Sequence, residues 1–314
     1  MESILHAFGI SAPVTQTELL SGGRIHRSFR VTTTAGDYIV QQFNSRVFRR
    51  PAQVMANIDT VTAYLRTQFP TETTLHFYRT AAGDFLHDGY RVMDYIPGVT
   101  LTAGDAPAVS RAAGAAFGHF VDLLASLNAA QLSVTIPGFH DTPARYAALE
   151  AAIRANPLDR AKHAVPLMQR LCDLREAACA LCRSDLPRRI VHNDTKLANL
   201  RFDAQTRRPV AVLDLDTVMP GLAAYDFGDM VRSLCGAALD MAVYHACLEG
   251  YLAGAACLNK AERASLPKGV LCITTELSVR YLTDYLTGDA YFQHPDSLRR
   301  ASELADFAWE SRGL

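Results

Sequence analysis

The first 95 residues carry short runs in which apolar and polar positions alternate, the pattern typical of half-buried β-strands. This pattern predicts strands over residues 14–20, 28–34, 38–43, 75–78 and 90–96. One stretch differs, because apolar side chains follow Pro51 at the three- and four-residue spacing of a helix. Pro97-Gly98 then stops the last strand. The pattern therefore predicts a small, mostly β unit built around one helix.

From Pro107 onward the spacing of apolar positions is helical. Helices are predicted over residues 112–129, 143–155, 165–183, 225–250, 262–286 and 297–309. Two short apolar runs, 189–191 and 210–213, predict a small β-hairpin between the third and fourth helices. The expected fold class is therefore α+β with two lobes: a small, mostly β lobe over residues 1–96 and a larger, mostly α lobe over residues 97–314. A cleft between two such lobes is a common ligand site.

Composition narrows the classes of partner. The chain has 314 residues, with 31 Lys and Arg against 32 Asp and Glu and a net charge of −1. Such a balance gives no overall field toward nucleic acid or an anionic membrane, so neither is an expected partner. Any phosphate-bearing partner must be held by a local site. A monomer or a weak homodimer is expected.

Two further patterns favour a cytoplasmic location. The first residues have no basic segment before an apolar run, and the longest weakly charged stretch, 236–256, is interrupted by Asp240, His245 and Glu249. The seven cysteines are an odd set within apolar helical patterns, which favours reduced thiols over a disulfide framework.

The most informative segment follows the strand at 189–191. It reads His-x-Asp-x-x-x-x-Asn, with Asp194, Lys196 and Asn199 at the polar positions. Phosphoryl transfer needs a carboxylate that accepts the proton of an attacking hydroxyl, and an oxygen ligand for Mg²⁺ nearby. Asp194 and Asn199 fit these two roles. Lys196 fits the neutralisation of phosphoryl oxygens in the transition state.

A second polar group follows the strand run at 210–213. Asp214 comes directly after the run, and Asp216 lies two residues further on. Mg²⁺ prefers one or two carboxylates together with phosphate and water oxygens. We therefore expect Asp214 to be a metal ligand, and Asp216 either to reach a second ion or to cap a turn.

The β lobe offers groups suited to a nucleotide. Gly22 and Gly23 lie between two predicted strands, where backbone amides can approach phosphates, and Ser28 adds a hydroxyl. At the end of the last strand, the carbonyl of Asp94 and the amide of Ile96 are placed to meet a purine edge. A glycine turn alone is weak evidence, but it gains weight beside the Asp-Asn-Asp set.

Taken together, these residues resemble the aminoglycoside phosphotransferase and choline kinase branch of the protein-kinase-like superfamily. The finer resemblance is to the N-acetylhexosamine 1-kinase group, carried by residues 192–200, 213–229 and 280–292. The resemblance to the broader branch spans nearly the whole chain. The two resemblances imply a two-lobed protein-kinase-like fold and Mg²⁺-dependent transfer of the γ-phosphoryl of ATP or GTP to a small-molecule hydroxyl, here the anomeric hydroxyl of an N-acetylhexosamine or related hexose. By motif, Asp194 would be the base, with Asn199 and Asp214 the metal ligands.

An Asp-Phe-Gly string at 226–228 matches the one that holds the metal-binding Asp of protein kinases. It lies 32 residues after Asp194 and opens a predicted helix, whereas Asp214 ends a strand. We therefore expect Asp214 to be the ligand. Asp226 is expected to brace the segment around Asp194 from a helix N-terminus.

The chain departs from most kinases in the β lobe. Their third strand carries a Lys paired with a Glu of the next helix, but this chain has Gln41 and Gln42 in the strand and no Glu over residues 52–67. Loss of both charges avoids an unpaired buried ion. We expect a neutral arrangement in which Gln41 or Gln42 pairs with Asn57, and a modest nucleotide affinity.

The acceptor side rests on the C-terminal segment. Arg280, Asp284 and Tyr291 offer the guanidinium, carboxylate and aromatic face that sugars require. Equally, Arg280 and Asp284 have the spacing of a surface helix pair. The rival acceptors are an aminoglycoside, choline, homoserine or another metabolite. The second rival, a non-catalytic pseudokinase, is disfavoured by the intact Asp194, Asn199 and Asp214.

Overall fold

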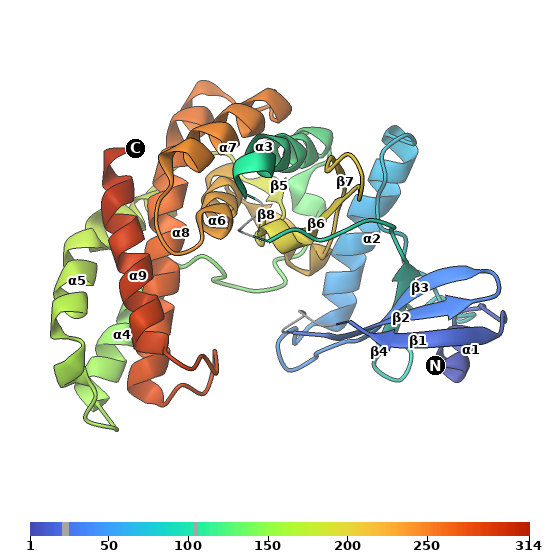
Figure 1. Cartoon of the computed structure of the whole chain (residues 1–314), viewed down its shortest axis with the longest axis horizontal. Helices are drawn as coiled ribbons and strands as arrows, with labels where there is room; N and C mark the ends of the chain where they lie inside the picture. The colour runs from blue at the N-terminus through green and yellow to red at the C-terminus, as the bar shows by residue number, and fades with distance from the viewer. Residues whose placement is uncertain (21–24, 103–105) are drawn as a thin grey trace.

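The computed structural model describes residues 1–20, 25–102 and 106–314. Its N-terminal lobe is a four-stranded antiparallel sheet in the order β1-β2-β3-β4, preceded by helix α1 (Glu2–Ala7) (Figure 1). The strands are β1 (Val14–Leu19), β2 (Arg27–Thr33), β3 (Gly36–Gln42) and β4 (Tyr90–Asp94). Four of the five predicted strands are thus confirmed. Helix α2 (Pro51–Gln68) is the predicted helix, with Pro51 in its first turn.

The predicted strand at 75–78 is wrong. The structure has only an isolated bridge between Phe77 and Met93, with the amide of Tyr78 donating to the carbonyl of Val92 at 2.9 Å. A ladder cannot extend from here, because the chain turns at once: the amide of Thr80 donates to the carbonyl of Asp84 at 2.8 Å.

Helix α2 joins the two lobes. Its buried face, which includes Val54, Ile58 and Val61, lies in one apolar cluster with Met93 of the sheet and Leu215 of the larger lobe. Figure 1 shows α2 standing between the sheet and the helices. The lobes therefore share a continuous core at this point.

The C-terminal lobe is mainly helical. Its helices are α3 (Ala106–Leu123), α4 (Thr142–Ala155), α5 (Val165–Cys179), α6 (Ala223–Cys235), α7 (Met241–Gly254), α8 (Lys260–Thr287) and α9 (Ser297–Glu310). The predicted α+β architecture, a small mostly β lobe and a larger mostly α lobe, is confirmed.

The single helix predicted over 225–250 is wrong, because the chain forms α6 and α7 there. Gly236 ends α6 with φ at 77°. The side chain of Asp240 then accepts hydrogen bonds from the amides of Ala242 and Val243 and begins α7. The spacing of apolar residues alone does not reveal that one helix ends and another begins within such a stretch.

Two small two-stranded sheets hold the polar segments of interest. One pairs β5 (Arg189–Val191) with β8 (Met219–Gly221), and the other pairs β6 (Leu200–Phe202) with β7 (Pro209–Val212). The two runs predicted as one hairpin, 189–191 and 210–213, therefore do not pair with each other. Instead, the two sheets bring the segment after β5 beside the segment after β7.

Helices α3 and α7 pack backbone against backbone. Gly114 of α3 lies against the backbone of Cys247 and Tyr251 in α7, and a Cβ added at Gly250 of α7 would lie 2.0 Å from the carbonyl oxygen of Arg111. From this position α3 places the rings of Phe117 and Phe120 about the ring of His192, with centroids 6.0 and 5.9 Å away. The segment after β5 thus rests on a closely packed helix pair.

Among the described residues, no helix has the length and apolar character needed to cross a membrane.

Candidate active site

The segment after β5 is held in place by Asp226, which lies in the first turn of α6. Its two carboxylate oxygens accept hydrogen bonds from the amides of His192 (2.8 Å) and Asn193 (2.7 Å). The hydroxyl of Thr195 donates to the carbonyl of Asp226 at 2.5 Å. Burial raises the pKa of the Asp226 carboxyl to about 6. The bracing role expected for Asp226 is confirmed by these contacts.

The next residue, Asp194, lies within a polar triad. Its Oδ2 accepts from Nζ of Lys196 at 2.6 Å and from Nδ2 of Asn199 at 3.0 Å. Burial alone would raise the pKa of Asp194, but the Lys196 ammonium and these hydrogen bonds hold it below its ordinary value. The pKa of Lys196 is raised, because attraction to Asp194 and Asp214 outweighs the effect of burial. The structure therefore holds Asp194 as an ionised carboxylate.

The segment after β7 reaches the same place. The amide of Leu213 donates to the carbonyl of Asn199 at 2.8 Å, and Nε2 of His192 lies 2.8 Å from the carbonyl of Leu213. Asp214 follows with a left-handed backbone, φ 58°. The two predicted polar segments are thus brought together, with Asp194, Asn199 and Asp214 at their junction.

The chemistry of this junction fits a magnesium ion. Asn199 donates through Nδ2, which leaves its amide oxygen as a ligand, and the Asp214 carboxylate has no hydrogen bond or ion pair within the described ranges. Burial and the nearby Asp216 and Asp194 carboxylates raise the pKa of Asp214, a repulsion that a cation would relieve. Mg²⁺ is usually held by one or two carboxylates together with phosphate and water oxygens, and Asn199 and Asp214 would supply the protein ligands of such a site.

Asp216 was expected either to bind a metal ion or to cap a turn, but both of its carboxylate oxygens are paired with side chains of the N-terminal lobe. Its Oδ1 lies 2.5 Å from Nη1 of Arg91, and its Oδ2 lies 2.8 Å from Nη2 of Arg91 and 2.5 Å from Nε2 of His26. Both oxygens are already occupied, because Arg91 and His26 reach across from the N-terminal lobe. We therefore leave Asp216 out of the candidate metal ligands.

The predicted neutral pair in the third strand is also wrong. The amide oxygen of Gln41 accepts from Nε of Arg91 at 2.9 Å, and its Nε2 donates to Oγ of Ser28 at 2.9 Å. Asn57 instead donates to the carbonyls of Ser133 and Val218. A buried arginine, rather than a second amide, satisfies Gln41.

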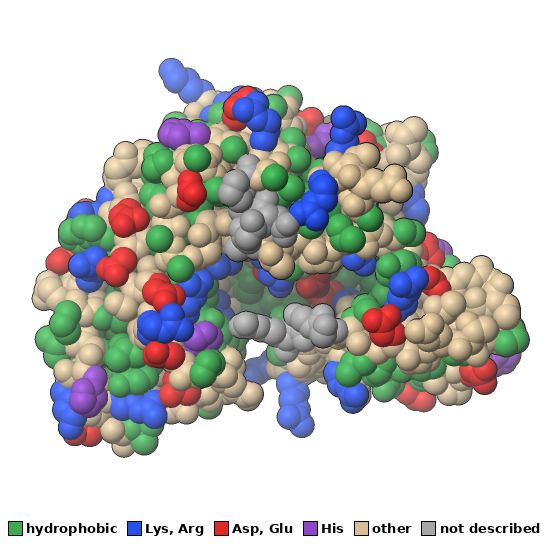
Figure 2. Space-filling view, viewed as in Figure 1, with side chains coloured by type: hydrophobic (Ala, Val, Ile, Leu, Met, Phe, Trp, Pro, Cys, Tyr) green, Lys and Arg blue, Asp and Glu red, His purple; other side chains and the backbone are tan. Residues whose placement is uncertain are grey.

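The remaining nucleotide-binding predictions lie on the edge of the same lobe. Asp94 ends β4, and its side chain accepts from the hydroxyl of Tyr78 at 2.7 Å. The amide of Ile96 makes no backbone hydrogen bond within the described ranges, which leaves it available to a ligand. Gly22 and Gly23 lie outside the described residues. Figure 2 shows that the face between the two lobes is deeply hollowed.

The three residues predicted to bind the acceptor, Arg280, Asp284 and Tyr291, differ in their exposure and contacts. Nη2 of Arg280 donates to the hydroxyl of Tyr291 at 3.1 Å, and the Tyr291 side chain is 70% exposed. Asp284 is buried, and its oxygens accept from the amides of Tyr291 and Phe292, both at 2.8 Å. Arg280 and Tyr291 thus present polar groups, whereas Asp284 organises the loop that carries Tyr291. The alternative pair, Arg280 with Asp284, does not form.

A family comparison now bears directly on this site. The model of the phosphotransferase enzyme family matches residues 16–264, a span that contains both polar segments and all of the N-terminal sheet except the first two residues of β1. The chain belongs to this family.

Solved structures of similar shape share the phosphotransferase fold. The ethanolamine kinase of Plasmodium vivax superposes with a TM-score of 0.61 at 12% identity, covering 93% of this chain and 81% of that one. An aminoglycoside phosphotransferase of Alicyclobacillus acidocaldarius gives 0.65 at 16% identity, with 96% and 93% covered. The GDP and kanamycin complex of APH(2")-IIia gives 0.66 at 13% identity, with 99% and 97% covered. The predicted two-lobed kinase-like fold is confirmed.

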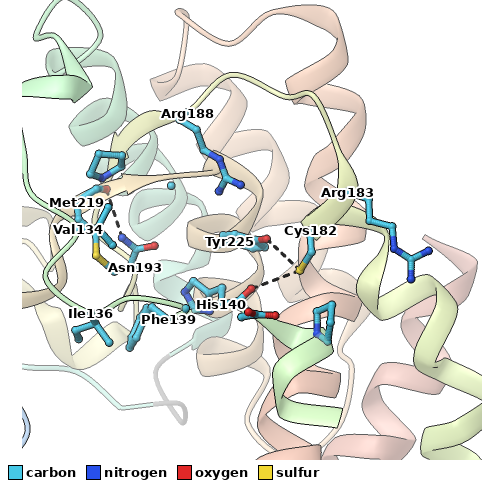
Figure 3. Close-up of a pocket in the computed structure, with 15 residues that line it drawn as sticks. Val134, Ile136, Phe139, His140, Cys182, Arg183, Arg188, Asn193, Met219 and Tyr225 are labelled. Atoms are coloured by element: carbon cyan, nitrogen blue, oxygen red, sulfur yellow. Dashed lines mark hydrogen bonds between the residues drawn. The ribbon is translucent and has the colours of Figure 1, made fainter. Parts of the chain in front are cut away.

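The phosphotransferase also has a cavity of about 530 Å³ in its larger lobe (Figure 3). Its walls include His140, Arg188 and Tyr225, and it reaches the active-site segment only through Asn193. Asp194, Lys196, Asn199 and Asp214 are not among the lining residues. We therefore do not assign this cavity to the reacting groups.

Two residues that contact the candidate site were missed from the sequence. Arg91 and His26 lie 125 and 190 residues from Asp216, so no local spacing connects them. The one available signal was Arg91 itself, a charged side chain beside the apolar Val92 and Met93 within the strand.

Proposed function

We propose that this phosphotransferase is a Mg²⁺-dependent kinase that transfers the γ-phosphoryl of ATP or GTP to a sugar hydroxyl, with the anomeric hydroxyl of an N-acetylhexosamine or related hexose as the preferred acceptor. The convergence of Asp194, Lys196, Asn199 and Asp214 at one junction carries the proposal. A base, a cation and two oxygen ligands together are the groups that phosphoryl transfer requires.

Each group has a distinct role in the proposed reaction. Asp194, ionised beside Lys196, accepts the proton of the acceptor hydroxyl as the hydroxyl oxygen bonds to the γ-phosphorus. The bond from that phosphorus to the bridging oxygen breaks, and the nucleoside diphosphate leaves. Lys196 contacts Asp194, and in the proposed reaction its charge offsets the negative charge of the transferred group. Asn199 and Asp214 would hold Mg²⁺, which neutralises phosphate charge when bound.

The nucleotide contacts are proposed for the N-terminal lobe. Ser28 and Gln41 are hydrogen-bonded to each other on adjacent strands, and Gly22 and Gly23 precede Ser28 in the chain. Asp94 and Ile96 offer backbone groups at the lobe junction. We also propose that the N-terminal, nucleotide-binding lobe ends near residue 96.

The charge around Tyr291 supports a neutral acceptor. Cationic acceptors are bound through free carboxylates, as charge complementarity requires. Here both carboxylate oxygens of Asp284 accept from backbone amides, and Oδ2 of Asp289 is paired with Nη1 of Arg160 at 2.6 Å, which offsets the charge of Asp289 although its Oδ1 is buried without a partner among the described residues. Arg280 and Tyr291 remain to meet hydroxyl or carbonyl oxygens, which suits an acetylated sugar better than an aminoglycoside or choline.

An acceptor panel tests the proposal. The protein is incubated with Mg-ATP or Mg-GTP and free hexoses, N-acetylhexosamines, aminoglycosides, choline, ethanolamine and homoserine, while diphosphate release and ³¹P spectra are followed. We expect a sugar 1-phosphate, lost in D194N and kept in D185N, which changes an exposed carboxyl of the loop before β5. Transfer only to an amine-bearing acceptor would overturn the sugar assignment. Transfer that survives D194N unchanged would overturn the site.

A further inference from the structure

One carboxylate of the larger lobe is enclosed by side chains of the smaller lobe. Arg91 of β4 is 2% exposed and Asp216 is 3% exposed, and the two form a bidentate pair at 2.5 and 2.8 Å. The third nitrogen of the guanidinium, Nε, donates to Gln41 at 2.9 Å. The planar fork of Arg91 is thus fully engaged, with one edge on each lobe.

His26 closes the other side of Asp216. Its Nδ1 accepts from the amide of Asn44 at 3.0 Å, so the ring proton lies on Nε2 and is directed to Oδ2 of Asp216 at 2.5 Å. The imidazole also stacks on the ring of Phe48, with centroids 5.5 Å apart and planes at 14°. Asp216 therefore receives fixed donors from two parts of the N-terminal lobe.

The enclosed carboxylate is rigidly connected to the candidate metal site. Asp216 lies two residues after Asp214, within the short 3-10 turn Leu215–Thr217. The hydroxyl of Thr217 donates to the carbonyl of His192 at 2.7 Å, which ties this turn to the segment that carries Asp194. A displacement of Asp216 would therefore move both Asp214 and the catalytic segment.

The contacts of Arg91 also extend to the strands of the N-terminal lobe that are proposed to bind the nucleotide. Ser28, Gln41, Arg91 and Asp216 form one continuous series of hydrogen bonds from β2 across β3 and β4 into the larger lobe. Gln41 stands where the family resemblance leads one to expect a lysine. The third strand thus has no positive charge, and the neighbouring strand β4 supplies one through Arg91. This guanidinium pairs with Asp216 and not with a phosphate.

We propose that Arg91 is a positioning residue: through Asp216 it sets the metal-binding turn of the larger lobe against the nucleotide-binding strands of the smaller lobe. Arg91 touches no reacting atom, since its donors are occupied and its side chain is buried. Arg91 therefore influences the affinity for the Mg²⁺–nucleotide complex, which both lobes contact in the proposed function. This inference rests on the proposed function, because it takes Asp214 as a metal ligand.

The chain offers a matched control. Arg189, which is half-buried, and the buried Glu262 form another bidentate pair, with Nη2 of Arg189 2.8 Å from Oε2 of Glu262, but both residues lie in the larger lobe. A substitution there removes a bidentate ion pair without removing a contact between the lobes. R189Q therefore reports what a purely structural loss does.

The experiment compares R91Q, D216N, the R91Q/D216N double variant and R189Q. Calorimetry gives the Kd of Mg-ADP and Mg-ATP, steady-state rates give the Mg²⁺ activation constant and the acceptor KM, and thermal unfolding gives Tm. We expect R91Q and D216N each to raise the Mg-nucleotide Kd and the Mg²⁺ activation constant about tenfold or more, with an unchanged acceptor KM. The double variant should be no worse than either single one, because both remove the same contact. R91K, which keeps the charge but loses the fork, should lie between wild type and R91Q.

The contrary results are distinct. If R91Q and R189Q lower Tm alike and neither changes the Mg-nucleotide Kd, Arg91 is only structural and the inference fails. The inference also fails if the effects of R91Q and D216N on this Kd are additive in the double variant. If R91Q does not fold, R91K decides, since a wild-type Kd in R91K also overturns the inference. A wild-type protein that binds no Mg-nucleotide would instead overturn the proposed function, whereas one that binds it but phosphorylates no sugar would overturn only the acceptor.

Discussion

Nζ of Lys196 lies 2.6 Å from Oδ2 of Asp194, the proposed base. This contact lowers the pKa of Asp194 against the opposing effect of burial. K196Q removes the cation, so the pKa of Asp194 rises and the acid limb of the rate profile moves to higher pH. We also expect kcat/KM near neutral pH to fall about 10²-fold, the usual cost of losing one transition-state contact. Initial rates from pH 4.5 to 8 measure both effects, and an acid limb that stays in place would contradict the assignment.

Asp214 should destabilise the protein in the absence of a cation. Burial and two neighbouring carboxylates raise its pKa, so D214N is expected to unfold at the same temperature as wild type or higher without Mg²⁺. With Mg-nucleotide at about 100 times its Kd, the wild type should gain about 2.7 kcal/mol and D214N little. Thermal unfolding with and without Mg-ADP measures the two differences. D185N serves as the control, and an equal gain in D214N would remove Asp214 from the metal site.

Asp226 should give stability a pH dependence of known sign. Its pKa rises from the ordinary 3.8 to about 6 on folding, so the folded state binds the proton more tightly than the unfolded state. The contribution of this group is full below pH 4 and is lost as pH rises through 6, by about 3 kcal/mol for a shift of about two units. D226N cannot titrate, so the free energy of unfolding of D226N minus that of wild type should increase over this window. Urea unfolding from pH 4 to 7 measures the difference, and a flat difference would refute the shift.

The glycine contact between α3 and α7 should tolerate no side chain. In an open helix, Gly to Ala gains about 1 kcal/mol from helix propensity. In α7 the new Cβ of G250A would meet the Arg111 carbonyl oxygen at 2.0 Å, so a loss of about 3 kcal/mol or more is expected. G313A is the control, because nothing lies within 4 Å of a Cβ there. Chemical denaturation of the two variants decides, and a stabilised G250A would mean that the helices are further apart.

Arg280 and Tyr291 should act on the acceptor alone. R280Q and Y291F each remove the hydrogen bond between the guanidinium and the phenol, and each removes a group offered to the sugar. We expect either change to raise the acceptor KM about tenfold and to leave the nucleotide KM unaltered, since a lost hydrogen bond to a charged group is worth about 1.5 to 3 kcal/mol. Initial rates with the best sugar of the panel measure this. A change in nucleotide KM would place these residues elsewhere in the reaction.

The sequence predicted those parts of the fold that depend on neighbouring residues. The sheet and α2 follow from alternation and from a proline at a helix start, and Asp194 and Asp214 follow from polar residues placed after short strands. The contact between Arg91 and Asp216 could not be predicted in this way, because it depends on how two lobes meet. For the same reason Asp216, two residues from Asp214, was considered as a ligand of a second ion although its carboxylate is paired with Arg91.

The α3–α7 contact has a consequence for how variants of this protein would be interpreted. Because the two helices touch through main-chain atoms, no rotamer change can absorb a larger residue, and the strain passes through Phe117 and Phe120 to the ring of His192. Alleles at Gly114 or Gly250 would therefore score as loss of function in a genetic screen although neither position reaches the reacting groups. A map of inactivating alleles would mark this helix crossing as strongly as Asp194, and only a measurement of folded protein would tell the two apart.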